Sequence, residues 1–171
     1  MELIIAAAQD LDYVADLVNK AYRGIAEPDW TTEKVYTNGP RTNASSLNGM
    51  IKSGAIILLA PDCDSGGLSG CVALSPAKSG EWGISMLAVS PQAQSAGLGR
   101  AIMAGAEKFA RDAGARSVKI SVINVRVKLI AWYERLGFAK TGEREPFSFG
   151  DSEIGGSRHD ELELVMLTKS L

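Results

Sequence analysis

The chain has 171 residues, of which 46% are hydrophobic and 22% are charged, and its formal net charge is −2. This length and composition are typical of one globular domain, and the near-neutral charge excludes a broad basic surface for nucleic acid. No apolar run approaches the length of a membrane span, the N-terminus lacks the pattern of a signal peptide, and the few cysteines and the single histidine have no metal-ligand spacing. We therefore expect a single domain over residues 1–171 that is cytoplasmic, binds no metal and has no nucleic-acid or membrane partner.

The first part of the chain is predicted to form a strand and two helices. Residues 2–8 are a short apolar run with isoleucines, which favours a strand. After Asp10, a fair N-cap, apolar residues recur with helical spacing as far as Gly24. A second helix is expected over residues 43–52 and ends before Gly54.

Residues 25–40 lie between these helices and break the periodicity with prolines, a glycine and an asparagine. Such a segment can line a pocket for an ammonium group, by ion pairs and cation–π contacts, or it can be a solvated connection whose aromatic side chains pack on the core. The mixture of acids and aromatics mildly favours a cationic ligand, which we state as a hypothesis. These residues are Glu27, Asp29, Trp30, Glu33 and Tyr36.

The middle of the chain is predicted to contain three strands in succession. The apolar residues 55–60 and 68–74 are separated by a turn and form a hairpin. A second turn leads to the strand 81–89. Pro91 ends that strand, because proline has no N–H to give to a sheet ladder.

A glycine-containing loop then joins this strand to a helix. Helical periodicity begins at Leu98, between Gly97 and Gly99, and ends before Gly114. The first N–H groups of a helix have no internal partners and carry positive potential, so this stretch predicts an anion site, most often for phosphate. A P-loop is excluded because no lysine follows Gly99, and a Rossmann fingerprint is excluded because Ile102 stands at the third glycine position.

The last part of the chain is predicted to contain a strand over residues 117–122 and a helix over 127–136, which Gly137 ends. Another strand starts at Phe138, a loop spans residues 144–160, and residues 161–169 form the last strand. The resulting order is β-α-α-β-β-β-α-β-α-β-β. It favours an α/β (α+β) class, with a mixed, mostly antiparallel sheet of about seven strands and helices on both faces.

Two stretches resemble motifs of one enzyme family. The loop Gln94-Ser-Ala-Gly97-Leu-Gly99, with its Leu-Ala-Val-Ser-Pro lead-in, resembles the Q/R-x-x-G-x-G/A pyrophosphate loop of the GNAT (Gcn5-related N-acetyltransferase) superfamily. The stretch Tyr133-Glu-Arg-Leu-Gly-Phe138 resembles its final motif, a helix ending in Y-E-x-x-G-F beside the coenzyme A thiol. The two stretches cover residues 84–143, and the order of elements is also that of the GNAT fold.

The resemblance implies an acetyl-CoA-dependent N-acetyltransferase. Its acceptor would be a primary amine of a small molecule or, second, of a peptide, which attacks the thioester directly. In the family, a main-chain N–H on the strand before the loop stabilises the oxyanion, and by register this is Leu87, with Val89 pairing to the pantetheine arm. The cofactor-binding residues implied by the resemblance are Leu87, Ala88, Val89, Gln94, Ser95, Ala96, Gly97, Leu98, Gly99, Arg100 and Asn124.

Tyr133 matches the family's tyrosine, which returns a proton to the leaving thiolate. A phenol with a pKa near 10 is close enough to a thiol for useful proton transfer. Without the motif, an aromatic residue at helical spacing would indicate core packing. With the motif, we interpret Tyr133 as the catalytic acid.

The general base is left open by the sequence. Some relatives carry a glutamate four residues before the oxyanion donor, but this chain has Gly83 there. Glu81, on the same strand face, is a weak candidate that would act through a water, and His159 is a weaker one. Many relatives have an asparagine seven residues before the tyrosine; Arg126 stands at that place, and Asn124 either contacts coenzyme A or caps the helix.

Two other functions fit the same resemblance. Because Gly83 replaces the acid, a non-catalytic acyl-CoA-binding sensor or interaction domain is the first alternative. An enzyme that uses another acyl donor, such as a succinyl donor, is the second. Many proteins of the family dimerise through their last strands, so a homodimer is also possible.

Overall fold

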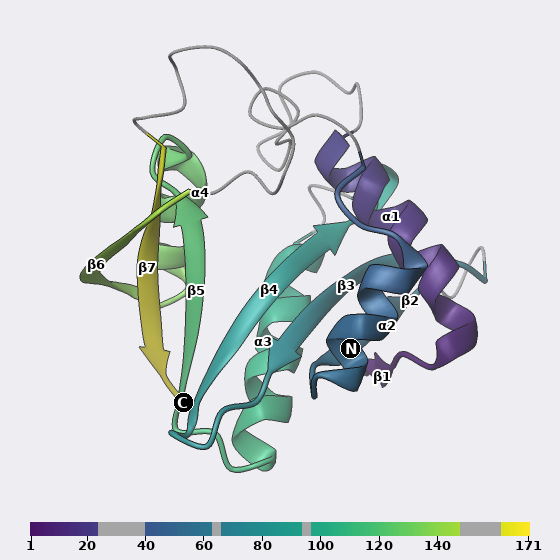
Figure 1. The fold of residues 1–171 in the computed structure, drawn as a ribbon, viewed down its shortest axis with the longest axis horizontal. Helices are drawn as coiled ribbons and strands as arrows, with labels where there is room; N and C mark the ends of the chain where they lie inside the picture. Colours follow the sequence, from purple (N-terminus) through teal and green to yellow (C-terminus); the bar gives the residue numbers. More distant parts are fainter. Residues whose placement is uncertain (24–39, 63–65, 94–96, 148–161) are drawn as a thin grey trace.

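A sheet of seven strands organises the structure, which is a computed structural model that describes residues 1–23, 40–62, 66–93, 97–147 and 162–171 (Figure 1). The strand order is β1-β2-β3-β4-β5-β7-β6, in which β4 and β5 are parallel and the other neighbours are antiparallel. This confirms the predicted mixed, mostly antiparallel sheet. The strands are β1 (Ile4–Ile5), β2 (Ile56–Pro61), β3 (Leu68–Ser75), β4 (Glu81–Val89), β5 (Ser117–Ile123), β6 (Ala139–Pro146) and β7 (Glu163–Ser170).

Helices cover both faces of the sheet, as predicted. One core cluster joins α1 and Leu47 of α2 to one face of β2, β3 and β4. The other joins α3 and α4 to the opposite face, and Figure 1 shows the two layers of helices on either side of the sheet. The helices are α1 (Leu11–Arg23), α2 (Ala44–Lys52), α3 (Leu98–Asp112) and α4 (Val127–Arg135), with short 3₁₀ turns at Ala8–Asp10 and Pro91–Ala93.

The first predicted strand is the main departure from the sequence prediction. Only Ile4 and Ile5 of residues 2–8 form a strand, and Ala8–Asp10 is a 3₁₀ turn. Asp10 accepts a hydrogen bond from the Ala7 N–H at 2.8 Å, so its side chain turns the chain before α1 begins. Strand β6 also extends to Pro146, into the predicted loop. Most other boundaries lie within two residues of prediction.

A bulge in β4 decides which side chains face which helices. In the register with β3, Ser85 pairs with Ala73 and Ala88 pairs with Cys71. Two residues of β4, Met86 and Leu87, therefore lie opposite one residue of β3, Val72. Met86, inside this bulge, has φ +54° and is the only non-glycine residue with positive φ in the described part of the chain. An extra residue reverses the facing of every side chain after it.

The two core clusters show this reversal directly. Trp82 and Ile84, before the bulge, belong to the cluster beneath α3. After the bulge, Ala88 packs in the cluster beneath α1, and Leu87 and Val89 pack toward α3. Residues 87 and 89 are therefore turned to the face that carries α3 and α4.

Strands β4 and β5 pair only at their beginnings. Glu81, Trp82 and Gly83 lie opposite Ser117, Val118 and Lys119, and the described register goes no further. Both strands continue toward their carboxyl ends, and Figure 1 shows them diverging into a V. The bulge and the divergence place the second half of β4 beside an opening in the sheet.

One ion pair connects α3 to β7, and its removal should destabilise the fold. Lys169 Nζ lies 2.7 Å from Glu107 Oε2, with 25% and 11% of the two side chains exposed. Replacing Lys169 by methionine keeps the apolar stem but leaves the Glu107 carboxylate buried without its partner. We expect a loss of about 2–3 kcal/mol in the free energy of unfolding, measured by urea denaturation.

The control for this prediction is Lys20→Met on α1. Lys20 forms an ion pair of similar length with Asp16, but both side chains are more than half exposed. Exposed pairs contribute less than about 1 kcal/mol. Equal losses in the two variants would show that burial of the Glu107–Lys169 pair has no special effect.

Candidate functional site

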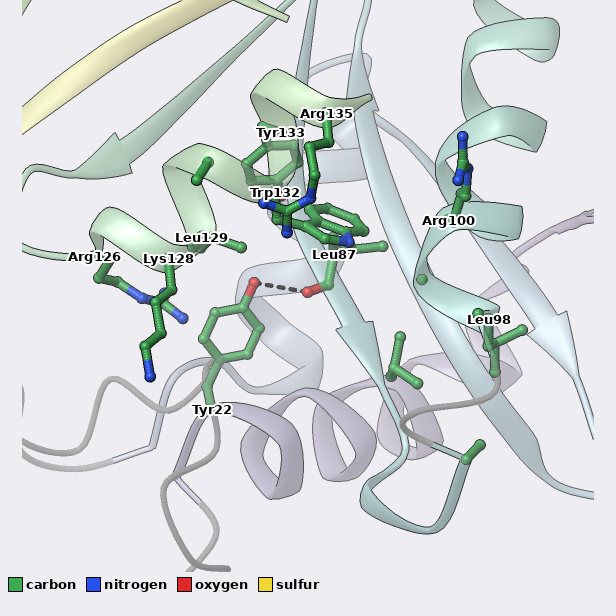
Figure 2. Close-up of a pocket in the computed structure, with 15 residues that line it drawn as sticks. Tyr22, Leu87, Leu98, Arg100, Arg126, Lys128, Leu129, Trp132, Tyr133 and Arg135 are labelled. Carbon is green, nitrogen blue, oxygen red and sulfur yellow. Dashed lines mark hydrogen bonds between the residues drawn. The ribbon is translucent and has the colours of Figure 1, made fainter. Parts of the chain in front are cut away.

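A pocket of about 550 Å³ lies where β4 and β5 diverge. Its wall takes residues from α1, β4, the loop before α3, and both α3 and α4 (Figure 2). Tyr22 reaches it from the face of the sheet that carries α1, and the α3 and α4 residues reach it from the other face. The lining residues are Tyr22, Leu87, Val89, Ala93, Gly97, Leu98, Gly99, Arg100, Arg126, Lys128, Leu129, Ala131, Trp132, Tyr133 and Arg135.

The N-terminus of α3 forms one side of this pocket. Gly97 is the N-cap and has φ +75°, a conformation that glycine adopts without strain. A Cβ on Gly99 would lie 3.7 Å from both Val89 and Trp132, so its absence leaves open space between β4 and α4. The first-turn N–H groups therefore border a cradle that a small anionic group can enter.

Four cationic side chains surround the same pocket, and no aspartate, glutamate or histidine does so among the described residues. Arg100 lies on α3, while Arg126 and Lys128 lie at the beginning of α4 and Arg135 at its end (Figure 2). Arg100 and Arg126 are candidates that the sequence already offers, whereas Lys128 and Arg135 are identified only by the structure. The sequence feature that could have indicated these two residues is their spacing. Lys128, Trp132 and Arg135 stand at i, i+4 and i+7, so they share one face of the helix.

Tyr133 lines the pocket and is also part of the core. The residue is only 8% exposed, and its ring packs edge to face on Trp132 at 4.8 Å and on Phe138 at 5.7 Å between centroids. Burial raises the pKa of Tyr133 to about 12, although the Arg126 charge acts in the opposite direction. No hydrogen bond holds its hydroxyl within the described part of the chain. The phenol is thus protonated at neutral pH and available to a ligand.

Tyr22 is a pocket residue that the sequence analysis missed. Its hydroxyl donates a hydrogen bond to the Leu87 carbonyl at 2.9 Å, across 65 residues of sequence (Figure 2). The sequence offers one indication of its placement: Tyr22 follows Val14 and Val18 at intervals of four residues, and residues four apart lie on the same face of a helix. That pattern predicts that Tyr22 is buried, which it is, but gives no indication of its partner.

The main chain of Leu87 lies at the edge of β4 that faces the pocket. Leu87 has no partner in the register with β3, and β5 has already diverged at this point. The N–H and C=O of one strand residue point to the same edge. The carbonyl bonds to Tyr22, and the described registers with β3 and β5 leave Leu87 without a paired residue.

Two of the predicted cofactor-binding residues are not on the pocket wall. Ala88 is buried in the cluster beneath α1, because the bulge turns it to that face. Asn124 joins β5 to β7: its Oδ1 accepts from the N–H groups of Val125 at 3.0 Å and Glu163 at 3.3 Å. Nor does Asn124 cap α4, whose N-cap is Arg126.

The structure also places Glu81 away from the pocket. It stands at the first, paired residue of β4, roughly 20 Å along the strand from Leu87 at about 3.3 Å per residue. Its carboxylate accepts a hydrogen bond from the Thr168 hydroxyl at 3.2 Å. Gly83, at the family's glutamate position, pairs with Lys119. Neither residue therefore supplies a base to the described pocket wall.

Several predicted residues lie outside the described part of the chain. They are Gln94, Ser95 and Ala96 of the loop, the acids and aromatics Glu27, Asp29, Trp30, Glu33 and Tyr36, and His159. Within the described residues, no cluster of three or more histidine, cysteine, aspartate or glutamate side chains is arranged to hold a metal. None of the described helices is long and apolar enough to cross a membrane.

Comparison with known proteins identifies the family. The sequence model of the acetyltransferase (GNAT) family matches residues 14–138. Among solved structures, a ribosomal-protein-alanine N-acetyltransferase from Brucella melitensis is similar over 100% of both chains, with a TM-score of 0.71 and 18% identity. No curated protein gave a significant sequence match.

Two further structures show the same fold. An N-acetyltransferase from Staphylococcus aureus Mu50 covers 99% of this chain and 97% of its own, with a TM-score of 0.70 and 15% identity. An IAA acetyltransferase from Bacillus cereus ATCC 14579 covers 99% of both chains, with a TM-score of 0.69 and 16% identity. At these identities the likeness supports the fold, and the acceptor has to be argued from the site itself.

Proposed function

The chain belongs to the GNAT acetyltransferase family, and from this membership we propose that it is an acetyl-CoA-dependent N-acetyltransferase. The acceptor is a primary amine of a small molecule or, second, of a peptide. The observation that carries the proposal is the pocket at the divergence of β4 and β5, where a helix N-terminus and four cations meet a buried phenol. Bound acetyl-CoA supplies an activated thioester from which an amine can take the acetyl group.

The described residues fit the polyanionic part of this cosubstrate. The loop amides after Gly97 and the side chain of Arg100 would hold the pyrophosphate, at the positive end of α3. Arg126, Lys128 and Arg135 add positive charge along α4. Positive side chains gathered around one pocket attract anions, which favours a ligand with several phosphate charges.

The main chain of β4 would orient the thioester end of acetyl-CoA. The N–H of Leu87, a residue without a register partner on β3, would stabilise negative charge on the acetyl oxygen. Val89, which also lines the pocket, would pair with the pantetheine arm. Both assignments come from the family resemblance, and the register of the bulge supports them.

Tyr133 would supply a proton to the departing sulfur. A phenol whose pKa is about 12 keeps its proton at neutral pH. Tyr133 lines the pocket, and its hydroxyl would therefore carry the proton that a departing thiolate needs.

A non-catalytic acyl-CoA-binding protein is the second candidate. It is favoured by one observation: the described pocket wall carries no carboxylate or imidazole that would take a proton from the incoming amine. An enzyme would then receive an already neutral amine or use a base outside the described residues. Turnover of acetyl-CoA with any member of a panel of primary amines would exclude the binding protein.

Calorimetric titration with acetyl-CoA tests the proposal directly. We expect binding of micromolar strength that weakens as ionic strength rises, because the cations of the pocket are partly exposed and salt screens them. Absence of binding at low salt would remove the cosubstrate and the acetyltransferase function with it.

Neutralising the cations at the start of α4 should weaken this binding. For the double variant Arg126→Gln and Lys128→Gln, we expect the Kd for acetyl-CoA to rise about tenfold to a hundredfold at low salt, the factor for two charge-assisted contacts. The salt dependence of the Kd should also become shallower. Lys52→Gln, on the exposed last turn of α2, is the control and should leave both quantities unchanged.

A further inference from the structure

The carbonyl of Leu87 depends on one side chain from a distant helix. Leu87 lies in the β4 bulge, directly after Met86 with its φ of +54°, and has no register partner on β3. Within the described residues, its carbonyl bonds to the hydroxyl of Tyr22 at 2.9 Å. A partly buried carbonyl without a partner is unfavourable, so this bond stabilises the Leu87 end of a peptide whose Ala88 end lies opposite Cys71 of β3.

Tyr22 is in turn held by the residues that follow the segment 24–39. The Arg41 guanidinium lies 5.5 Å from the centroid of the Tyr22 ring, a cation–π contact. Asn19, one turn earlier on α1, binds the same stretch. Its Oδ1 accepts from the N–H groups of Arg41 at 2.6 Å and Thr42 at 3.2 Å, and its amide donates to the Thr42 carbonyl at 3.0 Å.

These contacts form one continuous path from α1 to the opening in the sheet. Asn19 fixes Arg41, Arg41 covers the Tyr22 ring, and the Tyr22 hydroxyl holds Leu87. Tyr22 reaches the pocket from the α1 face, whereas Tyr133 packs among the side chains of the α3 and α4 face. Tyr22 is therefore not a duplicate of the proposed proton donor.

We propose that Tyr22 is a positioning residue, whose hydroxyl fixes the Leu87 peptide in the bulge and so aims the Leu87 N–H into the pocket. The inference rests on the proposed function, in which that N–H stabilises charge on the acetyl oxygen. The carbonyl and the N–H of Leu87 are joined through a single Cα. Restraining the carbonyl therefore limits the orientations that the N–H can adopt, and preorganised donors contribute most to catalysis.

The test compares Tyr22→Phe with Tyr13→Phe, which makes the same change on the same helix at a side chain that is 71% exposed. The readout is NMR-detected hydrogen exchange of the Ala88 amide, which shares its peptide unit with the Leu87 carbonyl and lies opposite Cys71. We expect exchange about tenfold faster in Tyr22→Phe and unchanged in Tyr13→Phe, with the amides of β5 as the internal reference.

A kinetic and binding readout separates positioning from packing. With an amine acceptor found in a panel screen, Tyr22→Phe should lower kcat about tenfold while the KM and the calorimetric Kd for acetyl-CoA change less than twofold. A packing defect would instead change binding, rate and thermal stability together. Should Tyr22→Phe fail to fold, Arg41→Gln, at an exposed residue, is expected to speed Ala88 exchange by about twofold to fivefold.

The outcomes distinguish this inference from the proposed function. Unchanged Ala88 exchange in both Tyr22→Phe and Arg41→Gln, with acetyl-CoA bound normally, would overturn the positioning role alone. Faster exchange with an unchanged kcat would also overturn it, because the Leu87 peptide would then not matter for transfer. Absence of acetyl-CoA binding to the unmodified protein would overturn the proposed function.

Discussion

Replacing Gly97 by aspartate is expected to abolish measurable binding of acetyl-CoA, with a Kd at least about a hundredfold weaker, or about 2.7 kcal/mol. Two effects add. The residue has φ +75°, which strains any side chain by about 1–2 kcal/mol. A carboxylate at the N-cap of α3 would also stand where the pyrophosphate is proposed to bind, and would itself neutralise the positive end of the helix. Calorimetric titration measures the change.

The fold should survive this substitution, because a Cβ on Gly97 meets no atom within 4 Å. Two variants separate charge from strain. Gly97→Asn places a side chain of the same size in the same left-handed conformation without a charge, and should weaken binding less than about tenfold. Gly114→Asp, at φ +91° beyond the other end of α3, carries equal strain and charge away from the pocket. If Gly114→Asp lost acetyl-CoA as well, the anion site at Gly97 would be contradicted.

Replacing Tyr133 by phenylalanine is the second large effect. We expect the rate of acetyl transfer to fall by about two to four orders of magnitude, the range for a lost general acid. The ring contacts with Trp132 and Phe138 are kept, so the Kd for acetyl-CoA and the melting temperature should change little. Stopped-time assays of the released thiol, with an amine from a panel screen, give the rate.

The pH dependence provides an independent check on Tyr133. Burial raises the pKa of its hydroxyl from 10.0 to about 12, so the acid form persists as pH rises and is lost only when pH passes through that value. The kcat of the unmodified enzyme should therefore show no alkaline decline from this group below about pH 10. A Tyr133→Phe variant that keeps full activity would assign the residue to the core alone.

Local features of the chain were predictable from the sequence. The helix after Gly97 begins at Leu98 and β4 spans Glu81–Val89, both as predicted, because starts, stops and periodicity depend on residues that are near one another in sequence. The glycine loop and the Tyr133 motif were found for the same reason. The residues of each motif lie within one loop or one helix, so each motif can be recognised from a short stretch of sequence. The family that the two motifs indicate is confirmed by the family model.

The first strand and the bulge in β4 show where such local patterns are insufficient. An apolar run at residues 2–8 has the composition of a strand, but Asp10 binds the Ala7 N–H and turns most of it out of the sheet. The bulge at Met86 reverses the faces of β4 relative to Trp82 and Ile84, and alternation in the sequence does not reveal an inserted residue.

The sequence by itself therefore determined the family, the order of elements and the two motifs, because each of these can be recognised from residues that are consecutive or spaced by one helical turn. Only the tertiary structure decided that Tyr22 holds Leu87, since the two residues are 65 positions apart and meet through the bulge. It also decided that Lys128 and Arg135 join Arg100 and Arg126 around one pocket. A chain with a net charge of −2 concentrates positive charge there because β4 and β5 diverge, bringing the ends of α3 and α4 to the same opening.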